Sequence, residues 1–143
     1  MTAGTMREVL LHGGPDEAFD RSIVFAKRLA ESFGARLHIL YTVEDPLTAG
    51  WTAEISAERL PEVHQAIENE ARERLVRSIS LEDQDRLGVQ LVIRTGIDEE
   101  ELVLYTEEHP IDLAIVHAPA ADPHTNLAHA LIERGRCAVL VLR

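Results

Sequence analysis

The stretch VHAPAADPHTNLAH, residues 116–129, lies where α/β proteins commonly hold a phosphate group, because it follows the apolar run IDLAIV and precedes a helix-like segment. Phosphate loops are built from glycine, whose backbone lets several N–H groups converge on the anion. This stretch contains no glycine, and Pro119 and Pro123 each remove an N–H donor. No lysine lies near it. The sequence therefore predicts the place of a phosphate loop without its phosphate contacts.

Histidine is the other residue type that could do chemistry here. His12 and His117 end two predicted strands, and His124 follows shortly afterwards. Neighbouring strands lie about 4.8 Å apart, so the two imidazoles could converge. Converging imidazoles would hold zinc or nickel or, when protonated, a small anion; solvated or hydrogen-bonded histidines are the plainer alternative. We expect no metal, because neither an HExxH nor a CxxC pattern is present.

Motifs for covalent or phosphate chemistry are missing elsewhere in the chain. The sequence has no GxSxG pattern, which would present a nucleophilic serine. The segment GGPDEAF, residues 13–19, lacks the Lys-Ser/Thr pair that completes a Walker loop. We therefore expect no catalytic residues and no enzyme activity.

Composition narrows the class of protein. The 143 residues, 45% of them hydrophobic, suit one domain spanning residues 1–143. A formal net charge of −11 disfavours nucleic acid and anionic membranes as partners. The single cysteine, Cys137, excludes an internal disulfide framework and favours a reducing compartment. Because the N-terminal segment also lacks a signal-peptide pattern, we expect a cytoplasmic protein.

Hydrophobic patterning predicts alternating strands and helices. Apolar runs predict strands at residues 7–12, 35–43, 89–94, 111–116 and 137–142. Apolar residues three or four apart predict helices at 16–33, about 60–85, 96–109 and about 124–134. This alternation indicates an α/β fold, a five-stranded parallel sheet of Rossmann-like type with helices on both faces. Ligands in such folds bind at the carboxyl ends of the strands.

Three passages together carry a family resemblance: AKRLAESFGARLHILYTVEDP (26–46), GIDEEELVLYTEEHPIDLAIV (96–116) and CAVLVLR (137–143). In this order they resemble the universal stress protein family over nearly the whole chain. The resemblance implies an adenine nucleotide alpha hydrolase-like fold with strand order 3-2-1-4-5. It also implies a homodimer through the strand at 137–142. We expect Val139, Val141 and Leu142 in that interface, since an apolar edge strand invites pairing with another chain.

The family divides into a branch that binds ATP through a glycine motif after the fourth strand and a branch that lacks it. Matched from that strand, the first two glycines of the motif fall on His117 and Ala120. Matched from the fifth strand, its last glycine falls on Thr125, so the loop is shorter than in the family. Gly14 stands where ATP-binding relatives have an aspartate beside the ribose, whereas Val43 keeps the apolar residue on the adenine side.

These departures predict a non-enzymatic, dimeric stress-response protein that does not bind ATP, requires no cofactor and acts through an unknown protein partner. The alternative is a small-molecule or nucleotide-binding protein that uses a remodelled pocket at the carboxyl ends of the first and fourth strands. A phosphate-transferring enzyme is the third possibility, which the missing motifs disfavour. The remnant pocket would comprise His12, Gly13, Gly14, Val43, His117, Ala120 and Thr125.

Overall fold

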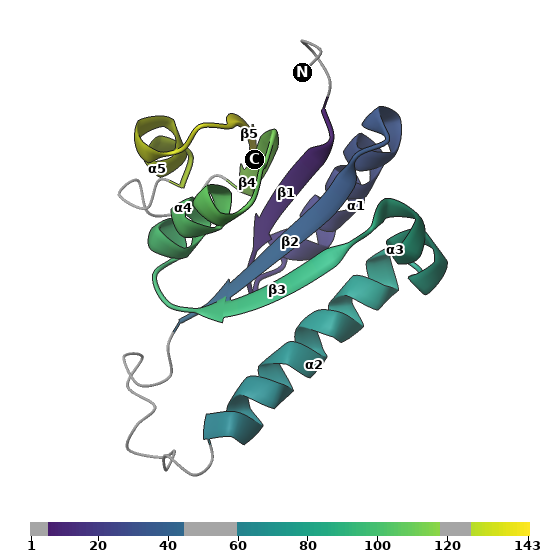
Figure 1. Ribbon diagram of the computed structural model, residues 1–143. Coiled ribbons are helices and arrows are strands. Elements are labelled where there is room, and N and C mark those ends of the chain that lie inside the picture. Colours follow the sequence, from purple (N-terminus) through teal and green to yellow (C-terminus); the bar gives the residue numbers. More distant parts are fainter. Residues whose placement is uncertain (1–5, 45–59, 118–126) are drawn as a thin grey trace.

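The computed structural model of the chain describes residues 6–44, 60–117 and 127–143. One parallel sheet has the strand order β3-β2-β1-β4-β5 (Figure 1). Its strands are β1 (Glu8–Gly13), β2 (Arg36–Val43), β3 (Gln90–Thr95), β4 (Leu113–His117) and β5 (Ala138–Leu142). The predicted fold class and the predicted strand order are therefore confirmed.

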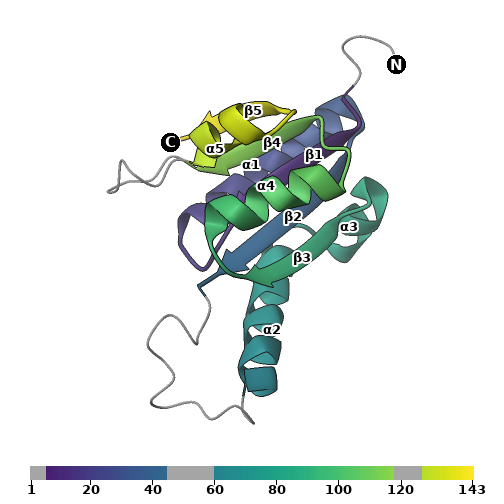
Figure 2. The same ribbon diagram turned by 60° about the vertical axis from the view of Figure 1, so that its left-hand side comes forward.

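Helices cover both faces of the sheet (Figure 2). In the described ranges they are α1 (Ala18–Phe33), α2 (Leu60–Ser78), α3 (Leu81–Leu87), α4 (Asp98–Glu108) and α5 (Leu127–Arg134). The first three pack on one face, and α4 and α5 pack on the other. None of the helices described is both long and apolar enough to span a bilayer.

Alternation along the central strand builds a separate apolar core on each face. Val9 and Leu11 of β1 pack with α1 and α2, while Leu10 between them packs with α4 and α5. All three side chains are fully buried. Strands covered on both faces appear in the sequence as continuous apolar runs, which is the pattern that predicts a parallel sheet.

Capping side chains set two helix boundaries that differ from the predicted ones. The helix predicted from residue 16 begins at Ala18, because the Asp16 carboxylate accepts the backbone N–H of Phe19 at 3.1 Å and lies outside the helix. The single helix predicted for residues 60–85 is wrong. It is broken before Ser80, whose hydroxyl accepts the N–H of Asp83 at 3.1 Å and starts α3.

Candidate functional site

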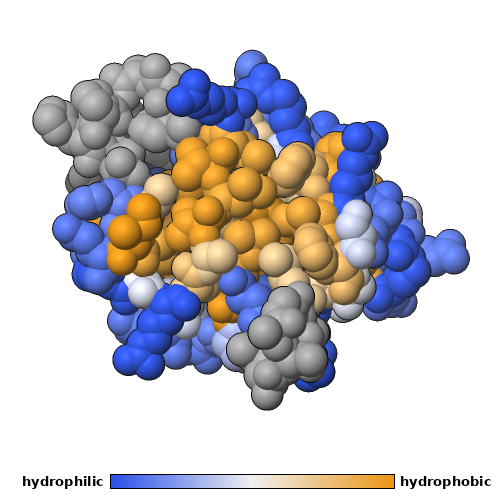
Figure 3. Space-filling model, turned by 90° about the horizontal axis from the view of Figure 1, so that it is seen from above, coloured by the Kyte–Doolittle hydropathy of each residue, from blue (hydrophilic) through white to orange (hydrophobic). Residues whose placement is uncertain are grey.

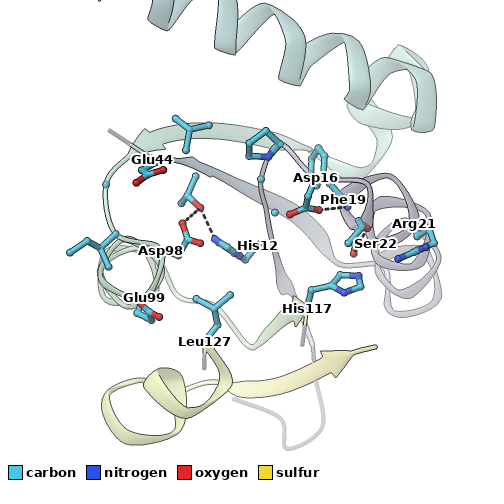
Figure 4. A pocket seen from close by; sticks show the side chains of 18 of the residues that line it. His12, Asp16, Phe19, Arg21, Ser22, Glu44, Asp98, Glu99, His117 and Leu127 are labelled. Atoms are coloured by element: carbon cyan, nitrogen blue, oxygen red, sulfur yellow. Dashed lines mark hydrogen bonds between the residues drawn. The ribbon is translucent and has the colours of Figure 1, made fainter. Parts of the chain in front are cut away.

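A cavity of 890 Å³ opens at the carboxyl edge of the sheet, between the ends of β1, β2 and β4 and the starts of α1 and α4 (Figure 4). Five of the residues predicted for a remnant pocket line it: His12, Gly13, Gly14, Val43 and His117. Ala120 and Thr125, predicted for the same pocket, lie outside the described residues, as does His124. Parallel α/β sheets usually bind ligands at this edge.

A hydrogen-bonded chain of three side chains crosses one wall of the cavity. The Nε2 atom of His12 lies 2.8 Å from the hydroxyl oxygen of Thr42, and that hydroxyl donates to Oδ1 of Asp98 at 2.8 Å (Figure 4). Neither Thr42 nor Asp98 was predicted as a site residue, although Asp98 ends one of the segments expected near the site. Both stand at the carboxyl edge, one at the end of β2 and the other as the first residue of α4. A polar residue at a strand end and an acid opening a helix were the available signals.

This chain fixes which nitrogen of the His12 imidazole carries a proton. The Thr42 hydroxyl has one proton, which it gives to Asp98, so Nε2 of His12 must donate to Thr42. Burial lowers the pKa of His12, against the opposing influence of the Asp98 and Asp16 carboxylates. The lowered pKa favours the neutral ring, in which the other nitrogen, Nδ1, carries a lone pair.

His12 and His117 both line the cavity, yet their imidazoles do not converge as the sequence led us to expect. Leu11 of β1 pairs with Ile115 of β4, so His12 stands level with Val116 rather than with His117. Successive side chains on a strand point to opposite faces. His12 accordingly points toward α4, whereas His117 points toward α1, and Figure 4 shows the two rings diverging. In the described ranges, no three histidine, cysteine, aspartate or glutamate side chains are grouped so that they could hold one metal ion.

The end of β1 and the turn after it form a second wall of the cavity. Lack of room for a side chain explains the glycine at position 13. A Cβ atom on Gly13 would lie 2.2 Å from Cδ1 of Phe19, and the φ angle of Gly13 is not positive. On the far side of this wall, the guanidinium of Arg74 from α2 donates to the carbonyl oxygens of Gly14, at 3.2 Å, and Asp16. Hydrogen bonds from the buried Arg74 thus support this wall on the side away from the cavity.

A model of the universal stress protein family (Usp) matches residues 9–143. The chain belongs to the universal stress protein family. None of the curated proteins matches it.

Solved structures agree on the fold of this universal stress protein. Universal stress protein UspA from Lactobacillus plantarum has a TM-score of 0.73 at 21% identity, covering 98% of this chain and 99% of its own. A universal stress protein in complex with cAMP has a TM-score of 0.62 at 17% identity, covering 98% of each chain. The universal stress protein from Archaeoglobus fulgidus in complex with dAMP has a TM-score of 0.57 at 15% identity, covering 96% and 98%.

The cavity of this universal stress protein has an acidic lining. Among its described lining residues, four carry carboxylates and two carry guanidinium groups. The formal charges of these six side chains sum to −2, and no lysine is among the described lining residues. The acidic members are Asp16, Glu44, Asp98 and Glu99, and the basic ones are Arg21 and Arg143.

Proposed function

We propose that this universal stress protein is a non-enzymatic, cytoplasmic stress-response protein that acts through a protein partner and does not bind ATP. The observation that supports this is the acidic cavity, whose described lining has an excess of two carboxylates. A triphosphate brings several negative charges and needs converging N–H donors or cations. Burial lowers the pKa of His12, which favours a neutral imidazole that offers the cavity a lone pair instead of a proton.

Millimolar ATP with magnesium is expected to leave the melting temperature unchanged and to release no binding heat. A ligand present at a hundred times its Kd stabilises a protein by about 2.7 kcal/mol, so micromolar affinity would be plain in a thermal-shift assay. AMP and adenosine, titrated in parallel, separate the effect of the phosphates from that of the base. Saturable ATP binding in calorimetry, or ATP retained through purification, would refute the proposal.

The second candidate function is binding of a small molecule in this cavity. Two structural relatives were solved with cAMP and with dAMP, which carry one phosphate each. A volume of 890 Å³ falls within the range of pockets that hold molecules of this size. In the assay above, stabilisation by AMP or adenosine without stabilisation by ATP would favour this candidate.

We also propose a homodimer formed through β5. This strand is an edge of the sheet, and Val141 on it is 45% exposed. Ile132 of α5 is 71% exposed, and Phe25 of α1 is 40% exposed. Phe25 lies on the side of α1 opposite the residues that form ion pairs with α2 and α3. Seen from above, the side on which Figure 1 places β5, hydrophobic residues form a continuous area bordered in part by hydrophilic ones (Figure 3). A symmetric copy of β5 would pair the open strand and cover this area.

Val141→Lys is expected to raise the dimer Kd by at least about a hundredfold, because a buried, unpaired ammonium costs several kcal/mol. Val76→Lys is the matched control, since Val76 is 46% exposed on α2 and lies far along the chain from β5. Sedimentation velocity over a concentration series measures both. A wild-type monomer at tens of micromolar, or equal effects of the two variants, would count against the β5 dimer.

A further inference from the structure

We propose that the cavity binds a small organic cation, held by His12, Asp16 and Asp98. This inference rests on the proposed function, under which the cavity is not an ATP site, and adds the chemical class of its ligand. The three side chains offer hydrogen-bond acceptors from different elements, namely the end of β1, the turn before α1 and the start of α4. A protonated amine or amidine supplies the matching donors together with the opposite charge.

The first acceptor is Nδ1 of His12. This side chain is only 7% exposed, and Nε2 is occupied by Thr42. Nδ1 has no hydrogen-bond partner in the part of the chain that the structure describes. Every fully buried polar side-chain atom in that part has a partner, so Nδ1 cannot be fully buried. Nδ1 must therefore reach accessible surface, which for His12 is the cavity it lines. A buried imidazole with one nitrogen anchored and the other presented to a cavity is a fixed acceptor.

The other two acceptors are carboxylates on either side of His12, and the electrostatic effect of both reaches its ring (Figure 4). Asp98 uses Oδ1 to accept from Thr42, and Asp16 uses Oδ1 to accept the N–H of Phe19. These contacts fix both carboxylates in place. The second oxygen of each has no hydrogen-bond partner among the described residues, so it remains available to a ligand donor.

The spacing of these groups favours a molecule over a metal ion. In the described ranges no three histidine, cysteine, aspartate or glutamate side chains lie close enough to hold one metal. The second imidazole of the cavity, on His117, points toward the opposite face of the sheet. An organic cation with separated N–H groups can reach acceptors that a single ion cannot, and the net negative lining attracts it.

Three four-carbon probes of equal length and different charge test the proposal. Putrescine, 1,4-butanediol and succinate are titrated into the wild-type protein by calorimetry at low salt. Putrescine is expected to bind with saturable heat, the diol at least tenfold more weakly, and succinate not at all. Equal binding of the diol and the diamine, or no saturable heat from putrescine at millimolar concentration, would overturn the proposal.

Asp98→Asn provides the matched variant, because the amide oxygen still accepts from Thr42 while the charge is removed. Its putrescine affinity should fall about tenfold, whereas Glu82→Gln, an exposed acid on α3 away from the cavity, should change it less than twofold. Equal effects of the two variants would show nonspecific attraction and overturn the site.

A histidine NMR titration locates the bound cation. A positive charge beside Nδ1 disfavours protonation, so putrescine should lower the pKa of His12 further. An unchanged His12 pKa at saturating putrescine would place the cation elsewhere and overturn the proposal. If neither putrescine nor ATP binds, only this inference fails, while ATP binding would remove the proposed function itself.

Discussion

Arg74→Met is expected to lower the free energy of unfolding by about 3 kcal/mol, because several hydrogen-bond acceptors lose their buried donor at once. Arg74 is 8% exposed and projects from α2. Its guanidinium donates to the carbonyl oxygens of Gly14 and Asp16, to the hydroxyl of Tyr41 at 3.3 Å and to the carboxylate of Asp20 at 3.2 Å. Methionine fills similar space, so the loss reports these four contacts rather than a cavity.

Arg72→Met is the control, because it removes the same charge from the same helix. The Arg72 side chain is 55% exposed and pairs only with Glu68 in the described structure, at 2.9 Å. Exposed pairs of this kind contribute about 0.5 kcal/mol or less. Urea denaturation of both variants gives the comparison. A loss below about 1 kcal/mol for Arg74→Met would show that the turn after β1 does not depend on the hydrogen bonds from Arg74.

Gly13→Ala is expected to lower the free energy of unfolding by about 2 kcal/mol through overpacking. The added methyl would lie 2.2 Å from Cδ1 of Phe19. The ring cannot move aside freely, because it is 1% exposed, contacts Tyr41 edge-on at 5.1 Å and carries the Arg74 guanidinium 5.0 Å above it. Ligand binding should suffer as well, since Gly13 lines the cavity.

A double-mutant cycle separates this clash from a backbone effect. Phe19→Leu removes the ring atoms that the new methyl would meet, so Gly13→Ala should cost less in that background. A coupling of at least about 1 kcal/mol in chemical denaturation is the expected result. Additive effects of the two substitutions would show that glycine is needed at position 13 for its backbone and not for space.

The fold class could be predicted from the sequence because its determinants are local, whereas the strand order was implied by the family resemblance. Apolar runs of six to nine residues mark the strands, and the apolar spacing in residues 16–33 and 96–109 marks helices that cover them. The break between α2 and α3 was missed, because the apolar period continues through Leu75 and Ile79 and only the cap at Ser80 interrupts it. A serine inside a charged stretch is a weak signal by comparison.

The location of the site could be predicted from the sequence, but the arrangement of its side chains could not. The strand ends locate His12 and His117 at the carboxyl edge, but the direction of a side chain depends on the register between β1 and β4, which neither strand encodes alone. Arg74 was missed for a related reason. It stands between Ala71 and Leu75 on the buried side of α2, and its partners are 33 to 60 residues away in the chain.

The central place of β1 governs the order in which this chain can fold. Its partner on one side, β2, follows after a single helix, with Val9 beside Leu37. Its partner on the other side is β4, with Val9 beside Leu113, so this contact closes a loop of more than a hundred residues. Long-range parallel pairing is slow, because the loop-closure entropy is lost before the contacts form. During synthesis, β1, β2 and β3 can therefore assemble first, and β1 keeps one open hydrogen-bonding edge until the ribosome has released β4.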